Sequence, residues 1–85
     1  MENIIIIDLE QTGKNIKKLM DHCEVSAKDI STSLGLSGPQ AVYRWIHGEA
    51  LPKVDHLVML TRLLKVSYID DILIVKEIKI SEAPN

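Results

Sequence analysis

A break of only two residues, Gly35 and Leu36, separates two short segments with the apolar spacing of α-helices. The segments are residues 26–34 and residues 37–47. Glycine favours the left-handed conformation in which helices commonly end, so the chain can turn sharply there. Two short helices joined by such a tight turn predict a helix-turn-helix.

Each segment begins with residues that can cap a helix. Ser26 and Asp29 have the spacing of a capping box, in which the two side chains bond each other's backbone N–H groups, and Ser37 and Gln40 repeat this spacing. Pro39 fits the second helix because proline is tolerated in the first helical turn. We therefore expect both helices to begin at their serines.

The second helix has an apolar side and a polar side. Val42, Trp45 and Ile46 form the apolar side, so Trp45 is expected in the core rather than stacked on a base. In a helix-turn-helix the second helix enters the major groove of DNA, where its first residues meet base edges. The DNA contacts predicted on this helix are Ser37, Gln40, Tyr43, Arg44 and His47.

Three further helical segments give an expected total of five helices, with a helical core over about residues 13–73. One begins at Thr12, and its apolar residues are Ile16, Leu19, Met20 and Cys23. The fourth helix opens at Pro52, and its expected inner stripe is Val54, Leu57, Leu60, Thr61 and Leu64. The fifth is short: it is capped by Ser67, has Asp70 at the box position, and ends near Leu73.

The two ends of the chain predict short β-strands, over residues 3–8 and 74–80. The first is rich in β-branched residues, and the second alternates between apolar and other side chains. A lone hairpin is marginal in water. The strands are therefore expected either to pair with each other and lie on the helical core, or to pair across a dimer.

The fourth helix carries more apolar residues than one inner stripe needs. Val58, Met59 and Leu63 are the surplus. They are expected to pack under the terminal strands or to form a dimer contact, because an exposed apolar patch usually marks such a surface.

Composition limits the classes of protein that fit. The 85 residues are expected to form one domain, and the net charge of −2 gives no general affinity for polyanions. The single cysteine excludes an intramolecular disulfide and a zinc site built from several cysteines. No apolar run is longer than that of residues 4–7, which is far shorter than the ~20 residues that span a membrane, so we expect a cytoplasmic protein.

Patterns typical of catalysis or ligand binding are missing from the sequence. It has no nucleophile–base arrangement and no glycine-rich phosphate loop, and its histidines lack the spacing of metal ligands. We therefore expect no enzyme activity, no cofactor, no metal and no small-molecule effector. Lys14, Lys17 and Lys18 form a small basic cluster, which is interpreted equally well as phosphate contacts or as the solvated side of a helix.

The spacing Val42-x-x-Trp45-x-x-Gly48-x-x-x-Pro52 resembles the Cro and phage-repressor type of helix-turn-helix domain, the XRE family. The resemblance covers about residues 13–73 and includes the run Ile30-Ser31-x-x-Leu34-Gly35. It implies five helices, binding to operator DNA, usually as a dimer, and regulation of transcription.

Carried over by position, Gln40, Tyr43 and Arg44 match places where family members approach bases or backbone. Ala27 departs from the glutamine that touches phosphate in many members, and Lys28 is the expected substitute. Lys65 stands at a helix end that is often glycine, where a left-handed conformation is required. The spacing from Gly35 to Gly48 is one residue longer than the commonest spacing in the family.

Each predicted DNA contact also has a structural alternative. Gln40 can fold back on Ser37 as a cap, Tyr43 can pack on Arg44, and His47 can cap the helix end. The whole chain has a second interpretation, as a protein-interaction module that retains the helix-turn-helix fold, such as an antitoxin-like or anti-repressor partner. The acidic pI of 5.8 and the apolar ends support that alternative.

Overall fold

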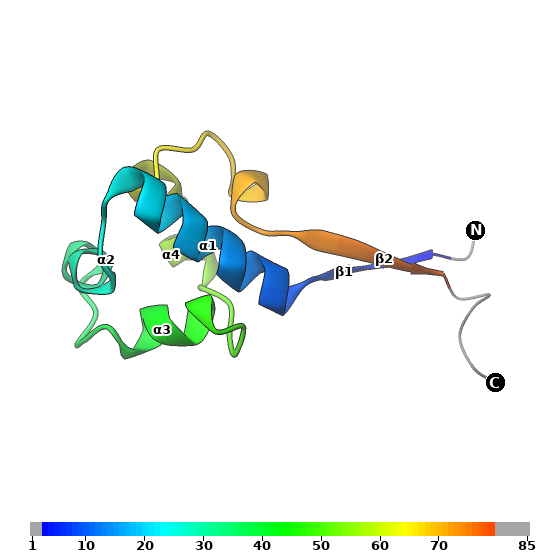
Figure 1. The fold of residues 1–85 in the computed structure, drawn as a ribbon, viewed down its shortest axis with the longest axis horizontal. Helices are drawn as coiled ribbons and strands as arrows, with labels where there is room; N and C mark the ends of the chain where they lie inside the picture. Colours follow the sequence, from blue (N-terminus) through cyan, green and yellow to red (C-terminus); the bar gives the residue numbers. More distant parts are fainter. Residues whose placement is uncertain (1–2, 80–85) are drawn as a thin grey trace.

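A computed structural model describes residues 3–79, which form four α-helices and one two-stranded antiparallel sheet (Figure 1). The elements in chain order are β1 (Asn3–Ile7), α1 (Leu9–Cys23), α2 (Ala27–Leu34), α3 (Gln40–Ile46), α4 (Val54–Leu63), the 3-10 turn η1 (Ile69–Asp71) and β2 (Val75–Lys79). The mainly helical class is confirmed, and the predicted count of five helices is wrong by one. Residue 80, where the second strand was expected to end, lies outside the described residues. None of the helices within 3–79 is long and apolar enough to cross a bilayer.

The predicted fifth helix is the single 3-10 turn η1. Asp71, one residue beyond the expected box position, accepts hydrogen bonds from the backbone N–H groups of Tyr68 at 2.9 Å and Ser67 at 3.2 Å. The Asn15 side-chain amide donates to the carbonyl oxygens of Asp71 at 2.8 Å and Ile72 at 3.0 Å. A longer helix would need those carbonyl oxygens for its own hydrogen bonds, so Asn15 helps to end it after one turn.

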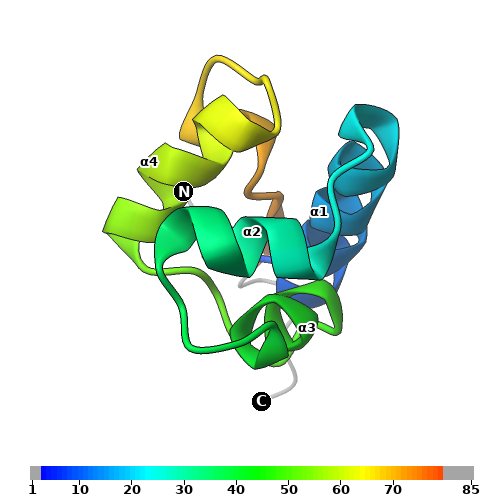
Figure 2. The same ribbon diagram turned by 90° about the vertical axis from the view of Figure 1, so that its left-hand side faces the viewer.

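The core lies where the four helices meet (Figure 2). Its most deeply buried apolar side chains are Ile16, Ile30, Val42, Leu60, Leu64 and Ile72. The expected inner stripe of α4 is confirmed at Leu57, Leu60 and Leu64. It is wrong at Val54, which is 73% exposed because it is the first residue of the helix and lies beyond the core.

Capping explains where α1 and α2 begin. α1 starts at Leu9, three residues before the predicted position, because Asp8 accepts a hydrogen bond from the Gln11 backbone N–H at 3.0 Å. The predicted capping box of α2 is confirmed: Ser26 and Asp29 bond each other's backbone N–H groups at 3.0 and 2.9 Å. Beyond α4, Lys65 has φ +58°, the left-handed conformation expected at that position.

α1 and α3 cross with their backbones in very close contact. An ideal Cβ built at Gly13 would lie 2.5 Å from the carbonyl oxygen of Trp45 and would also overlap that of Ile46. Next to this crossing, Gly48 adopts φ +73° and packs against the backbone of Glu10. Only glycine fits at residue 13, so this crossing fixes how α3 is oriented on the domain.

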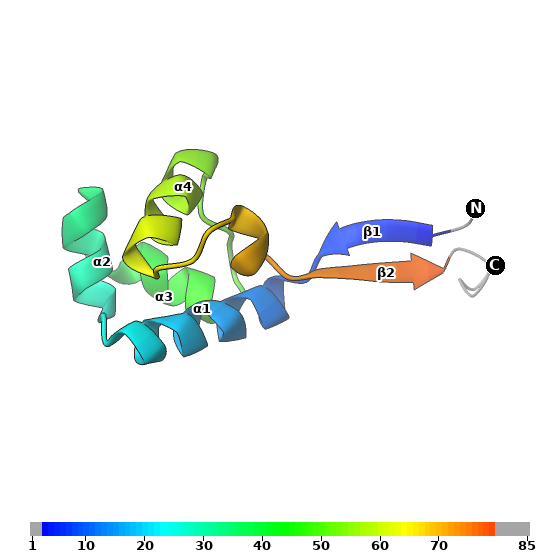
Figure 3. The same cartoon turned by 90° about the horizontal axis from the view of Figure 1, so that it is seen from above.

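The two terminal strands pair within the chain and project away from the helices (Figures 1 and 3). Ile5 lies opposite Glu77 in this antiparallel ribbon. The expectation that paired strands lie on the helical core is wrong. Val58 and Met59 of α4 accordingly stay exposed, at 46% each, and are not packed under the ribbon.

Three hydrogen bonds fasten the base of the ribbon to the start of α1, and the longest runs from the Thr12 hydroxyl to the Ile74 carbonyl oxygen at 3.4 Å. The Asp8 backbone N–H donates to the Ile74 carbonyl oxygen at 2.7 Å, and the Ile74 N–H donates to the Thr12 hydroxyl oxygen at 2.9 Å. Thr12 is almost fully buried, so its hydroxyl serves this contact rather than solvent.

Replacing Gly13 by alanine should lower the free energy of unfolding by about 1–3 kcal/mol, because the added methyl group forces α1 and α3 apart. Urea unfolding followed by circular dichroism measures the change. The neighbouring exposed substitution Lys14→Ala is the control, and it should change stability by less than about 0.5 kcal/mol. Alanine favours helix over glycine, so an unchanged or more stable Gly13→Ala variant would contradict the close crossing.

Stability should also depend on pH through Asp29. Hydrogen bonds from the Ser26 backbone N–H and then its hydroxyl hold the pKa of Asp29 below its ordinary value of 3.8. The capping box therefore contributes its stabilisation above pH 3.8, and this contribution is lost as the pH falls through the lowered pKa. Thermal melts should show Asp29→Ala less stable than wild type at neutral pH, with the difference closing in strong acid. A difference that stays constant down to pH ~2 would show that the ionised carboxylate is not the cap.

Candidate nucleic-acid interface

The second helix of the helix-turn-helix, α3, begins at Gln40 rather than at the predicted Ser37. Ser37 makes no capping hydrogen bond, and Pro39 is the N-cap residue. A residue before proline avoids the helical conformation, so Gly38 cannot belong to the helix. The first backbone hydrogen bond of α3 runs from the Tyr43 N–H to the Pro39 carbonyl oxygen at 3.1 Å. The turn after α2 is therefore longer than the two residues predicted.

The back of α3 is buried in the domain. Val42 is fully buried and Trp45 is 5% exposed, which confirms Trp45 as a core residue. The Trp45 ring packs 6.0 Å, between centroids, from the ring of His56 on α4. Ile46 is half-buried at the edge of the same core. These contacts leave α3 no freedom to rotate about its own axis.

The outward side of α3 is open to solvent. Among residues 3–79, no other helix or strand covers its lower side in Figures 1 and 2. All six residues predicted to contact DNA are exposed: Lys28, Ser37, Gln40, Tyr43, Arg44 and His47. Tyr43 and His47 stack with their ring centroids 6.5 Å apart, so they form one continuous aromatic surface along α3.

Two of these side chains are held by local contacts. The Gln40 amide folds back over Gly38, where its Oε1 atom occupies the space of a missing Cβ, rather than onto Ser37. The Arg44 Nε atom lies 3.9 Å from the Glu49 Oε1 atom. Both members of this ion pair are more than half exposed, so the pair is weak and leaves the guanidinium available to a ligand.

The predicted basic cluster of α1 is partly neutralised. Lys14 pairs with Glu10 at 3.7 Å, and Lys17 pairs with Asp21 at 2.6 Å, both one helical turn apart on the exposed side of α1. These pairs favour the solvated-face interpretation for the two lysines, and they lower the positive potential beside α3.

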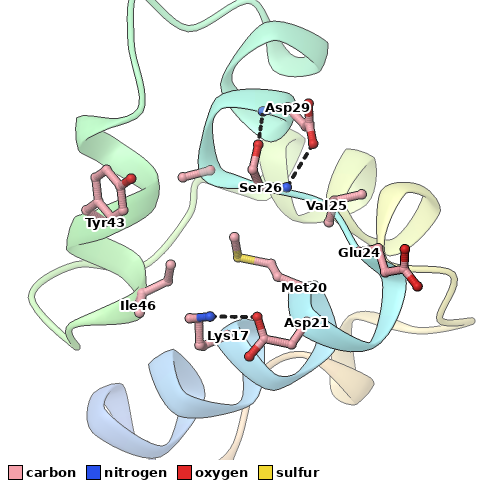
Figure 4. A pocket seen from close by; sticks show the side chains of 10 residues that line it. Lys17, Met20, Asp21, Glu24, Val25, Ser26, Asp29, Tyr43 and Ile46 are labelled. Carbon is pink, nitrogen blue, oxygen red and sulfur yellow. Dashed lines mark hydrogen bonds and ion pairs between the residues drawn. The ribbon is translucent and has the colours of Figure 1, made fainter.

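A hollow of about 520 Å³ lies between α1, the start of α2 and α3 (Figure 4). Tyr43 and Ile46 of α3 line one side of it, and Met20 lies at its floor. Three carboxylates surround it: Asp21, Glu24 and Asp29. Lys17 also lines the hollow and pairs with Asp21, so Glu24 and Asp29 are the carboxylates there without a lysine partner among the described residues. Their charges make the outer side of Tyr43 more favourable for phosphate than this hollow.

The chain matches no protein-family model, and a search of curated proteins finds no match either. Among residues 3–79, no three histidine, cysteine or acidic side chains are grouped closely enough to hold a metal ion.

Val42 and Trp45, which anchor α3, were predicted from the sequence, but the glycine on which α3 crosses α1 was not. Gly13 makes the α1–α3 crossing possible, but a single glycine within a helical pattern does not specify its partner. The sequence does carry a local signal for the start of α3, because Pro39 disfavours the helical backbone conformation at Gly38. That signal competed with the capping-box spacing of Ser37 and Gln40, which the structure does not use.

Burial of the only tryptophan gives a direct optical test of α3 packing. Acrylamide should quench Trp45 fluorescence weakly in the folded protein and strongly after unfolding in urea. Adding duplex DNA should leave the emission nearly unchanged, because the ring faces the core. Strong quenching of the native protein by acrylamide, or by DNA through base stacking, would contradict this placement.

Proposed function

We propose that this chain is a cytoplasmic, sequence-specific DNA-binding regulator of transcription that inserts α3 into the major groove. The observation that carries the proposal is the pairing of an open polar side with a fully anchored apolar side on α3. A reading helix needs both, because base contacts require exposed donors and acceptors held at a fixed position.

Each exposed residue of α3 has a suitable nucleic-acid contact. Arg44 can donate two hydrogen bonds to the O6 and N7 atoms of guanine, and Gln40 can pair with the N6 and N7 atoms of adenine once it leaves Gly38. Tyr43 can contact a phosphate or a thymine methyl group. Lys28, which is exposed at the start of α2, can neutralise a phosphate.

The charge distribution predicts an interface with few phosphate contacts. The net charge is −2, and two lysines of α1 are already paired with acids. Each neutralised phosphate contributes about −0.9 to the slope of log affinity against log salt on duplex DNA. We therefore propose that specificity depends mainly on Arg44 and Gln40 and on the binding of two copies, with α3 helices about 34 Å apart on one face of the DNA.

Selection from a random duplex library, at low and at moderate salt, tests this proposal. Wild type should enrich a defined sequence, and Gln40→Ala with Arg44→Ala should lose it, since each good bidentate contact discriminates by about 1–3 kcal/mol. The melting temperature of this double variant should stay close to that of wild type, because both residues are exposed.

The chain supplies a matched control, because Arg62 is its only other arginine and is exposed on α4. Arg62→Ala changes the net charge by the same amount as Arg44→Ala and should retain the enriched sequence. Equal enrichment by wild type and the double variant would show that α3 does not read bases.

The second candidate function is a protein-interaction module, such as an antitoxin-like or anti-repressor partner. A groove of about 340 Å³ between α2 and α4 favours it, since this groove is lined by the exposed apolar residues Val58 and Met59. The acidic edge of the hollow beside Tyr43 also suits a protein better than a phosphate backbone. Absence of duplex retention at both salt concentrations would support this alternative.

A further inference from the structure

We infer that two copies of this chain associate through the outer edges of their β1 strands, forming one four-stranded antiparallel sheet across a two-fold axis. The starting observation is that, within residues 3–79, the helical domain holds the β1–β2 ribbon only at its base. It extends away from the helices, and its isoleucines face solvent on both sides; Ile5 alone is 65% exposed. A two-stranded ribbon is marginal in water, whereas three or more strands with an apolar face are stable.

The two edges of the ribbon differ in chemistry. β1 reads Asn-Ile-Ile-Ile-Ile and carries no charge, whereas β2 contains Lys76, Glu77 and Lys79. Charged side chains are a common means of keeping an edge strand from pairing with another chain. β2 therefore has a protected edge, and no other strand within residues 3–79 pairs with the outer edge of β1.

Symmetry and charge favour pairing of the two β1 strands over pairing of the two β2 strands or of β1 with β2 of another copy. The register that pairs all five residues of two antiparallel β1 strands places Ile5 of one copy opposite Ile5 of the other. The same register for β2 against β2 places Glu77 opposite Glu77, and like charges directly opposite each other are destabilising. Pairing β1 of one copy with β2 of the next leaves free edges at both ends and builds open chains rather than a closed dimer.

This assembly places both α3 helices on the same side of the four-stranded sheet. The importance of that arrangement for DNA binding rests on the proposed function. The strands overlap in Figure 1 and lie side by side in Figure 3, so the sheet is roughly perpendicular to the vertical of Figure 1. α3 lies below the level of that sheet. Two antiparallel strands are related by a two-fold axis perpendicular to their sheet, which preserves up and down. The sheet would separate the two helical bodies by about the 17 Å length of five extended residues, with both α3 helices facing the same way.

Introducing a charge at Ile5, the residue on the two-fold axis, tests the inference without DNA. Sedimentation equilibrium should give wild type the mass of two chains. Ile5→Lys and Ile5→Glu should each give the mass of one chain, because each variant places like charges opposite each other. An equal mixture of the two variants should again give the mass of two chains, since only a residue at the axis faces its own copy.

A matched control separates edge pairing from face-to-face packing. Val75 lies on the same face of the ribbon as Ile5 but on the other strand, and it is 56% exposed. Val75→Lys should remain a dimer. A monomeric Val75→Lys, a monomeric wild type, or a mixture of Ile5 variants that fails to dimerise would each overturn the inference.

Folding and function are kept apart in this experiment. Circular dichroism should give each variant the helix content of wild type, because the ribbon lies outside the helical core. Since no DNA is present, a wild-type dimer that fails the library selection would contradict only the proposed function. A wild-type monomer that enriches a DNA sequence would contradict only the dimer.

Discussion

The structure depends on the crossing of α1 over the end of α3, where Gly13 lies directly on the carbonyl groups of Trp45 and Ile46. α3 has only seven residues, too few to be stable as an isolated helix. Its position is therefore set from outside, by this crossing and by the burial of Val42 and Trp45. A side chain at residue 13 would move α3 and, with it, every exposed group on its outer side.

The same helix α1 also holds the ribbon. Thr12 accepts a hydrogen bond from the Ile74 N–H, and the Asn15 amide donates to two carbonyl oxygens at the end of η1. Both residues lie within one helical turn of Gly13. α1 thus connects the proposed reading surface to the proposed dimer edge through one rigid element. In such an arrangement, the spacing between two copies of α3 is determined by how the two ribbons pair.

Local signals in the sequence predicted much of the fold, and contacts between distant residues account for the differences. The capping box of Ser26, the buried Trp45 and the exposure of the polar side of α3 follow from short spacings. The length of the fifth helix does not, because Asn15, 56 residues away from Asp71, helps to end it. Five of the six candidate contact residues were predicted by their position on one face, and Lys28 was predicted from the family resemblance. The fold of Gln40 over Gly38 depends on the turn geometry.

Backbone amide NMR during titration with the selected duplex tests the central claim, that the outer side of α3 is the binding surface. The account predicts that the largest shifts occur at Gln40, Tyr43, Arg44 and His47, while amides of α4 around Met59 remain unchanged. Shifts centred on the α2–α4 groove, with the α3 amides unaffected, would contradict it and would favour a protein-binding role.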